Sequence, residues 1–170
     1  MIRFILGLWL CCFALALGAA EAKWYFDVPQ AQAVAKKERK LVFIDFTGSD
    51  WCGWCMKLKQ EVFSTSEFKN YAHTNLVLVE IDLPHAKPLS IEQLTANMRA
   101  QEQYHVEGFP TIIVLSQEGQ EIWRLPSYTP GTAADWIRTM ESLRSRAGLA
   151  PAASSAPKTE TSAPVAQKKS

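Results

Sequence analysis

The sequence has no excess of charge of either sign, and this excludes several classes of function. Its 18 lysines and arginines nearly balance 17 aspartates and glutamates, which leaves a formal net charge of +1. A chain with so little net charge generates no long-range field toward nucleic acid or an anionic membrane. Histidine is scarce too, with three in 170 residues. The composition, with 48% hydrophobic and 21% charged residues, is instead typical of a packed globular protein.

The first 22 residues are expected to be a secretory signal peptide rather than part of the fold. Arg3 precedes an apolar run over residues 4–20, and Ala20-Glu21-Ala22 has the small-residue pattern of a cleavage site. We expect cleavage after Ala22, with Ala20 as the second candidate. The apolar run is also at the lower limit of the about 17–25 residues that span a bilayer, so an uncleaved membrane anchor is the alternative.

Cysteine is scarce once this segment is removed. Cys11 and Cys12 lie inside residues 1–22, so Cys52 and Cys55 are the two of the four cysteines that the exported chain keeps. A close pair in an oxidising compartment has three interpretations: a redox pair, half of a zinc site, or a structural disulfide. A zinc site needs about four ligands, and the exported chain has no second C-x-x-C and no H-x₃₋₅-H segment. A structural disulfide across so short a loop would constrain the unfolded chain little. The redox interpretation is therefore favoured.

Hydrophobic patterning divides the exported chain into one domain and a tail. Residues 147–170 are rich in Ala, Pro, Ser and Thr without an apolar period, so we expect them to be disordered. The folded domain is expected over residues 23–146. Two nearly continuous apolar runs, residues 41–48 and 75–83, have the pattern of strands buried on both faces.

The other segments of the domain alternate between helical and strand patterns. Further strands are expected over 111–116 and 121–128, and helices over 28–40, 53–63, 64–73, 90–106 (with Ser90 as its N-cap) and 132–146. Strands that alternate with helices imply a parallel βαβ unit with a right-handed crossover, and the closing strand–turn–strand adds an antiparallel hairpin. The predicted fold class is α/β, with a central mixed sheet and helices on both faces.

The position of the two cysteines fits thiol–disulfide exchange. They stand at the start of the helix predicted over residues 53–63, where free backbone N–H groups and the helix dipole favour a thiolate. Their i, i+3 spacing puts both sulfurs on one face of the first turn. We expect Cys52 to be the exposed nucleophile at the N-cap, and Cys55, one turn in and more buried, to resolve the mixed disulfide. The dithiol then serves as the redox centre, without a metal, nucleotide or flavin cofactor.

Two segments resemble the thioredoxin superfamily. "FIDFTGSDWCGWCMKLK" (residues 43–59) is similar to its active-site segment, and "VEGFPTIIVL" (residues 106–115) is similar to its Gly-x-Pro-Thr segment before a strand. The resemblance implies a thioredoxin fold in which the Phe109–Pro110 peptide bond is cis and lies against the C-x-x-C, and the backbone of Phe109 pairs with extended substrate. It covers residues 24–145 and is nearest to small secreted bacterial proteins, including periplasmic disulfide oxidoreductases of the DsbH kind.

The resemblance also assigns roles to residues around the cysteines. Many thioredoxins carry a buried Asp as proton acceptor for the resolving thiol, and Asp45 resembles that residue; an Asp satisfied at a strand edge is the alternative. The loop over residues 47–50 is one residue longer than usual. Leu78 stands where thioredoxins carry a lysine, and a buried carboxylate without a cation has a raised pKa. Gly53 and Trp54 lack the histidine of strong oxidants, which favours a potential nearer to about −270 mV than about −120 mV.

The tryptophans and histidines divide into candidate contacts and structural residues. Trp54 is expected to contact substrate, whereas substrate contact and core packing are equally open for Trp51. The remaining tryptophans of the domain are expected to pack in the core: Trp24, Trp123 and Trp136. The histidines are expected at the surface or as caps: His73, His85 and His105.

Together these features predict a periplasmic or secreted thiol–disulfide oxidoreductase that acts on protein disulfides, with reduction as the expected direction. A reductant in that compartment needs a membrane protein that passes electrons outward, whereas an oxidant needs an oxidase. Two alternatives are a thioredoxin-like chaperone or adaptor that holds peptides at Phe109 and Pro110, and a dedicated redox partner of one secreted protein, for instance in cytochrome c maturation. The intact C-x-x-C argues against the first. No nucleic-acid partner is expected, and a monomer is the default.

Overall fold

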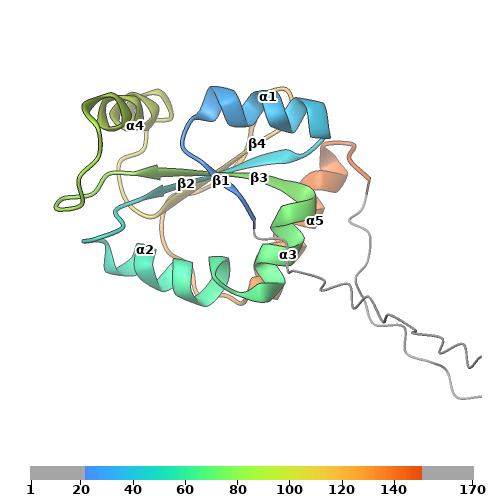
Figure 1. The fold of residues 1–170 in the computed structure, drawn as a ribbon. Helices are drawn as coiled ribbons and strands as arrows, with labels where there is room; N and C mark the ends of the chain where they lie inside the picture. The colour runs from blue at the N-terminus through green and yellow to red at the C-terminus, as the bar shows by residue number, and fades with distance from the viewer. Residues whose placement is uncertain (1–21, 151–170) are drawn as a thin grey trace, which may run out of the picture.

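A five-stranded mixed sheet runs through the centre of the computed structural model, which describes residues 22–150 (Figure 1). Its strands are β1 (Trp24–Tyr25), β2 (Leu41–Thr47), β3 (Leu76–Asp82), β4 (Thr111–Leu115) and β5 (Glu121–Leu125). Their spatial order is β1-β3-β2-β4-β5. Strand β3 is parallel to both β1 and β2, while β4 is antiparallel to β2 and to β5. The predicted parallel βαβ unit with an antiparallel hairpin is therefore confirmed.

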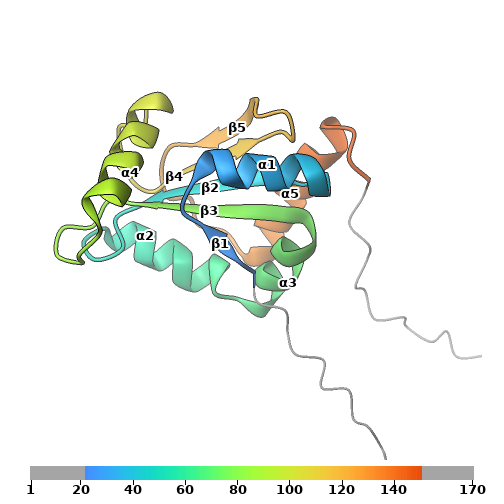
Figure 2. The same ribbon diagram turned by 45° about the horizontal axis from the view of Figure 1, so that its top comes forward.

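Helices cover both faces of this sheet, as the two views show (Figures 1 and 2). The first face carries α1 (Val28–Glu38) and α4 (Ile91–Gln103), which pack on Val42, Ile44 and Phe46 of β2. The second face carries α2 (Gly53–Leu58), the π-helical turn η1 (Lys59–Phe63), α3 (Ser66–Asn75) and α5 (Ala133–Arg146), which pack on the alternate β2 residues. Figure 2 shows the β4–β5 hairpin at the far edge of the sheet from β1.

The burial of β2 explains why its sequence reads as a continuous apolar run. All seven residues of β2 are buried, because successive side chains point into two separate hydrophobic clusters. Leu41 and Phe43 join the cluster beneath α2 and α3, which also takes in Trp136, with 6% of its surface exposed. The prediction that Trp24, Trp123 and Trp136 pack in the core is confirmed, since the first two lie partly buried against the same cluster.

Two elements differ in kind from the predicted ones, and one predicted cap is confirmed. Strand β1 was not predicted, because two residues are too few to form a pattern; it pairs Trp24 with Leu78 at the edge of the sheet. The helix predicted over residues 53–63 changes from α-helical to π-helical geometry after Leu58, and the Ser64 N–H donates to the Lys59 carbonyl at 2.8 Å. The predicted Ser90 cap is present, since its hydroxyl accepts from the Gln93 N–H at 3.1 Å.

The chain is ordered past the predicted end of the domain. Leu149 belongs to the segment that the sequence assigns to the tail, yet it is 5% exposed and packs in the core. The Arg144 guanidinium donates to the Ala150 carbonyl at 2.7 Å and fixes this end. Except for Ala22, which packs against the core, the predicted signal peptide lies outside the described residues, as does the rest of the predicted tail. Within residues 22–150 every helix is too short or too polar to cross a membrane.

Candidate active site

Cys52 and Cys55 meet at the start of α2, where the chain leaves the carboxyl end of β2. A tight turn makes this connection, because the Cys52 N–H donates to the Gly48 carbonyl at 2.9 Å. Cys52 is the N-cap of α2, and its sulfur accepts from the Cys55 N–H at 3.2 Å. The two sulfurs form a disulfide with the Cα atoms 5.3 Å apart. Position, spacing and backbone donors thus agree with the predicted redox pair.

The expectation that Cys52 is exposed was wrong for this oxidised state. Cys52 is 6% exposed and Cys55 is 4% exposed, so the two differ little. Gly48 contributes to this tight enclosure, because a Cβ at that position would lie 2.3 Å from the Trp51 ring. The aromatic side chain can therefore lie over the turn that leads into Cys52. Neither cysteine therefore protrudes from the surface in this state.

Asp45 lies in the sheet on the face that α2 covers. It alternates with Leu41 and Phe43 along β2, and it is 4% exposed. Its Oδ1 is buried and has no hydrogen-bond partner among residues 22–150. Burial, reinforced by the neighbouring Glu80 carboxylate, raises the pKa of Asp45 to about 8. An acid of this kind holds a proton at neutral pH and can exchange it with a thiol.

The charged neighbours of Asp45 differ from those expected. The register of β2 and β3 pairs Asp45 with Glu80, while Leu78 lies opposite Phe43. The expectation of no nearby cation also needs correction, because Lys59 from η1 lowers the pKa of Asp45 against the larger effects of burial and Glu80. The Lys59 ammonium lies 2.9 Å from the Glu80 carboxylate. The cation near Asp45 therefore comes from a helical turn rather than from the neighbouring strand.

The loop before β4 brings a proline to the same region. The Phe109–Pro110 peptide bond is cis, and Pro110 is buried. The Thr111 hydroxyl donates to the Gly108 carbonyl at 2.7 Å and closes this loop. The half-buried Phe109 ring meets the Trp51 ring edge to face, with centroids 5.6 Å apart. This contact joins the proline loop to the turn that carries Cys52.

Trp51 forms one side of the surface around the cysteines. It remains 40% exposed, although its indole N–H donates to the Leu83 carbonyl at 2.8 Å. The His85 ring lies flat on it, with centroids 4.6 Å apart and planes at 7°. Trp51 is therefore neither a core residue nor a free side chain, since its position is fixed while part of its surface stays open.

Trp54 provides a second exposed aromatic ring next to the cysteines. It is 58% exposed and stacks on Tyr128, from the segment after β5, with centroids 4.9 Å apart. The Lys57 ammonium lies 5.5 Å from the Trp54 ring centre and 5.4 Å from the Tyr128 ring centre. The Tyr128 hydroxyl donates to the Glu61 carboxylate at 2.7 Å. The fixed, exposed indole can contact an extended chain that approaches the disulfide.

Two residues of this surface, His85 and Tyr128, were not predicted as part of the site. His85 was assigned to the surface or to a cap, and Tyr128 was given no role. Folding brings both residues to the aromatic rings beside the cysteines, because their stacking partners Trp51 and Trp54 lie far away in sequence. The patterns around them, Pro84 to Pro88 and the end of the hairpin, indicate only loops.

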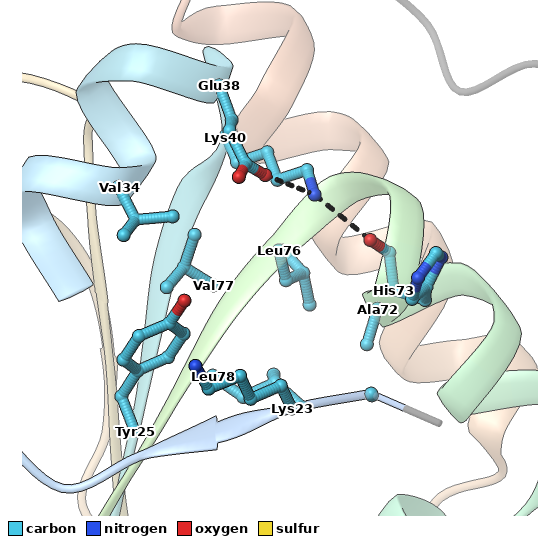
Figure 3. A pocket seen from close by; sticks show the side chains of 11 residues that line it. Lys23, Tyr25, Val34, Glu38, Lys40, Ala72, His73, Leu76, Val77 and Leu78 are labelled. Carbon is cyan, nitrogen blue, oxygen red and sulfur yellow. Dashed lines mark hydrogen bonds and ion pairs between the residues drawn. The ribbon is translucent and has the colours of Figure 1, made fainter. Parts of the chain in front are cut away.

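A second hollow lies at the opposite end of the sheet (Figure 3). It is lined by Tyr25, Glu38, Lys40 and His73 among others, near the amino ends of β2 and β3. Its central cation is already used, because the Lys40 ammonium donates to the His73 carbonyl at 3.0 Å and pairs with Glu38 at 2.7 Å. The Lys40 ammonium is therefore not left free for a ligand in this hollow.

Known proteins resemble this chain in sequence and in fold. Residues 28–141 match the family described as a thioredoxin-like domain. A disulfide bond reductase DsbH of Chlamydia pneumoniae is 33% identical over 126 residues, which are 74% of this chain and 75% of the relative. A thiol:disulfide interchange protein DsbD of Pasteurella multocida is 28% identical over 66% of this chain but only 19% of its own length. A solved DsbH oxidoreductase superposes with a TM-score of 0.68 at 32% identity, covering 79% of this chain and 90% of that chain.

Proposed function

This chain belongs to the thioredoxin-like family and is a thiol–disulfide oxidoreductase of the Dsb type, and from that premise we propose that it reduces disulfides of proteins in the periplasm. The observation that carries the proposal is the Cys52–Cys55 pair at the N-cap of α2, with one backbone N–H donating to the Cys52 sulfur and fixed aromatic side chains on the neighbouring residues. A pure binding protein would need neither thiol.

The reaction begins from the reduced dithiol. The Cys52 thiolate attacks one sulfur of the substrate disulfide, and the other substrate sulfur leaves as a thiolate that takes up a proton. The N-cap position supports this role, because the Cys55 N–H points at the Cys52 sulfur and favours its negative charge. Cys55 then loses its proton and attacks Cys52, which releases the second substrate thiol. Two electrons pass to the substrate, and the chain is left with the Cys52–Cys55 disulfide.

Asp45 is proposed as the group that accepts the Cys55 proton when it is ionised, so this step should quicken as the pH rises toward its raised pKa. Its pKa, raised to about 8 by burial and by Glu80, is close to the ordinary cysteine pKa of about 8.5, so a proton can pass between them at little cost. Cys55 and Leu58 are the buried residues of α2, and Leu58 packs in the same cluster as Phe43 of β2. Cys55 therefore faces the layer that contains Asp45.

The direction of electron flow rests on two supports. Gly53 and Trp54 place no charged side chain between the cysteines, so the thiolate form gains no added stabilisation there. The DsbH relative is described as a disulfide bond reductase. A reductant outside the cytoplasm needs renewed electrons, and we propose a membrane thiol–disulfide interchange protein as the donor. Export rests on residues 1–22, which have the composition of a signal peptide.

The test is the equilibrium reduction potential of the chain from residue 23 onward in a glutathione buffer. A reductant should give about −250 mV or lower, and the Cys52→Ala variant should show no two-electron couple. A value above about −180 mV would make the protein an oxidant or isomerase and contradict the proposed direction. If the couple is absent from the unaltered chain while it still retains unfolded polypeptides, a peptide-binding chaperone replaces the enzyme.

A further inference from the structure

An inference that deepens the proposed function comes from the segment after β3, which is bound tightly to the active-site turn. The Asp50 carboxylate, two residues before Cys52, accepts three backbone N–H groups of this segment: His85 at 2.9 Å, Ala86 at 2.7 Å and Lys87 at 2.8 Å. These donors lower the pKa of Asp50 to about 2, so its carboxylate keeps its charge at any physiological pH. We name this set of three bonds the clasp. These three bonds therefore fix the path that the backbone of this segment takes over the active-site turn.

Neighbouring contacts extend the same clasp. Ser49 donates to the Asp82 carboxylate from its N–H at 2.9 Å and from its hydroxyl at 2.6 Å. The Lys87 ammonium lies 3.6 Å from the same carboxylate. The Trp51 indole N–H donates to the Leu83 carbonyl at 2.8 Å. Three consecutive residues of the turn thus bond to this region: Ser49 to the last residue of β3, and Asp50 and Trp51 to the chain that follows it.

What this clasp positions is an exposed ring rather than a core side chain. Residues 85–88 are all exposed, so core packing does not explain why their backbone is held by three bonds. The held backbone carries His85, whose ring stacks flat on Trp51 at 4.6 Å. Trp51 in turn contacts Phe109, the residue before the cis proline. His85, Trp51 and Phe109 form a continuous row beside Cys52, which we name the histidine wall.

The chemistry of this wall favours one kind of substrate. The charge of Asp50 is taken up by three N–H groups and that of Asp82 by Ser49 and Lys87, so the wall presents mainly ring surfaces. A planar or apolar side chain can stack on such surfaces, with a gain per pair that corresponds to a factor of about 2 to 10 in rate. Trp54, which lies between the two cysteines in the sequence, and its stacking partner Tyr128 offer similar ring surfaces.

We propose that His85 is a specificity-determining residue, held by Asp50 as a positioning residue, and that the histidine wall selects polypeptide disulfides with an aromatic or large apolar residue next to a cysteine. Glutathione disulfide has no such side chain and gains little from the wall. Selection between substrates, rather than the reactivity of the sulfur, is the property that His85 controls.

The test compares three disulfides as substrates of the reduced chain from residue 23 onward. Two are short peptides closed by one disulfide, with Phe or Ser beside the attacked cysteine, and the third is glutathione disulfide. The His85→Ala variant should lower the second-order rate constant for the Phe peptide about 3- to 10-fold, and should reduce the ratio of Phe to Ser rates by nearly as much. His73→Ala, at the opposite end of the sheet, is the matched control and should leave the ratio unchanged.

Asp50→Ala tests the positioning role. It should lower the same ratio although His85 is still present, and the Asp50→Ala/His85→Ala double variant should be no worse than the worse single variant, because both act through one element. A merely structural role would instead lower the unfolding midpoint without changing the ratio. The inference fails if His85→Ala leaves the ratio unchanged, or if all three substrates slow equally. If the unaltered chain reduces neither peptide, the proposed function fails as well.

Discussion

The buried carboxyl of Asp45 makes a strong prediction about how stability depends on pH. Between the ordinary value of 3.8 and the raised pKa of about 8, the folded chain keeps a proton on Asp45 that the unfolded chain has lost. The folded state therefore binds more protons in this window, and the free energy of unfolding must fall as the pH rises. The Asp45→Asn variant cannot ionise, so it should escape this loss.

The size of the effect follows from the pKa shift. The difference between 3.8 and about 8 is about 4 units, and each unit corresponds to about 1.4 kcal/mol. Ionisation of Asp45 thus removes up to about 6 kcal/mol by pH 8, an upper limit because water entry and relaxation lower the cost of a buried charge. Below pH 4 the variant and the unaltered chain should agree within about 1 kcal/mol, since both then carry a neutral side chain of similar shape.

Urea unfolding of the oxidised protein at pH 4 to 9 provides the assay, since the disulfide-bonded cysteines do not titrate. The stability gained by Asp45→Asn should rise by about 1.4 kcal/mol per pH unit from about pH 5 and level off near pH 8. Exposed Glu67, changed to Gln, is the control and should show no such slope. The Glu80→Gln variant removes the adjacent charge and should lower the pKa of Asp45. In that background the stability gained by Asp45→Asn should therefore level off at a lower pH. A gain that is constant with pH would refute the reasoning.

Three further predictions concern the surroundings of the site. Gly48→Ala should displace the Trp51 ring, which lies 2.3 Å from the added Cβ, and destabilise the chain by about 1–3 kcal/mol; near-ultraviolet circular dichroism and urea unfolding would detect both effects. Tyr128→Ala should free Trp54 and slow reduction of the Phe peptide about 2- to 10-fold, a result to be checked by the same rate measurement. Thr132→Ala should break the capping box of α5 and cost about 0.5–2 kcal/mol, seen as a lower thermal midpoint.

The fold could be predicted because its information is local and repeated. The apolar runs that became β2 and β3, and the polar caps that begin α4 and α3, each carry a pattern over several residues. Strand β1 was not predicted, because Trp24–Tyr25 is too short to show a hydrophobic period and is defined only by its pairing with β3. The register of β2 against β3 is also non-local, and for this reason the acidic neighbour Glu80 and the helical cation Lys59 were missed.

The candidate site divides in the same way. Cys52, Cys55 and Pro110 could be found because the spacing of a motif encodes their chemistry, and the structure shows the disulfide between the two cysteines and a cis bond before Pro110. The low exposure of Cys52 could not be predicted, because burial depends on how the folded chain packs around it and no local pattern encodes that. The sequence shows His85 as one histidine between two prolines, and nothing near it reveals the Trp51 ring beneath it.

Two aspartates in one short segment show why residue type alone is a poor guide to role. Asp50 is exposed yet accepts three backbone N–H groups, so its pKa falls to about 2 and its charge can serve as a permanent clasp. Asp45 is buried with an unpartnered oxygen beside Glu80, so its pKa rises to about 8 and its proton becomes exchangeable near neutral pH. The first can hold geometry because it does not titrate, and the second can move a proton because it does. Exchanging their environments, rather than their side chains, would exchange their functions.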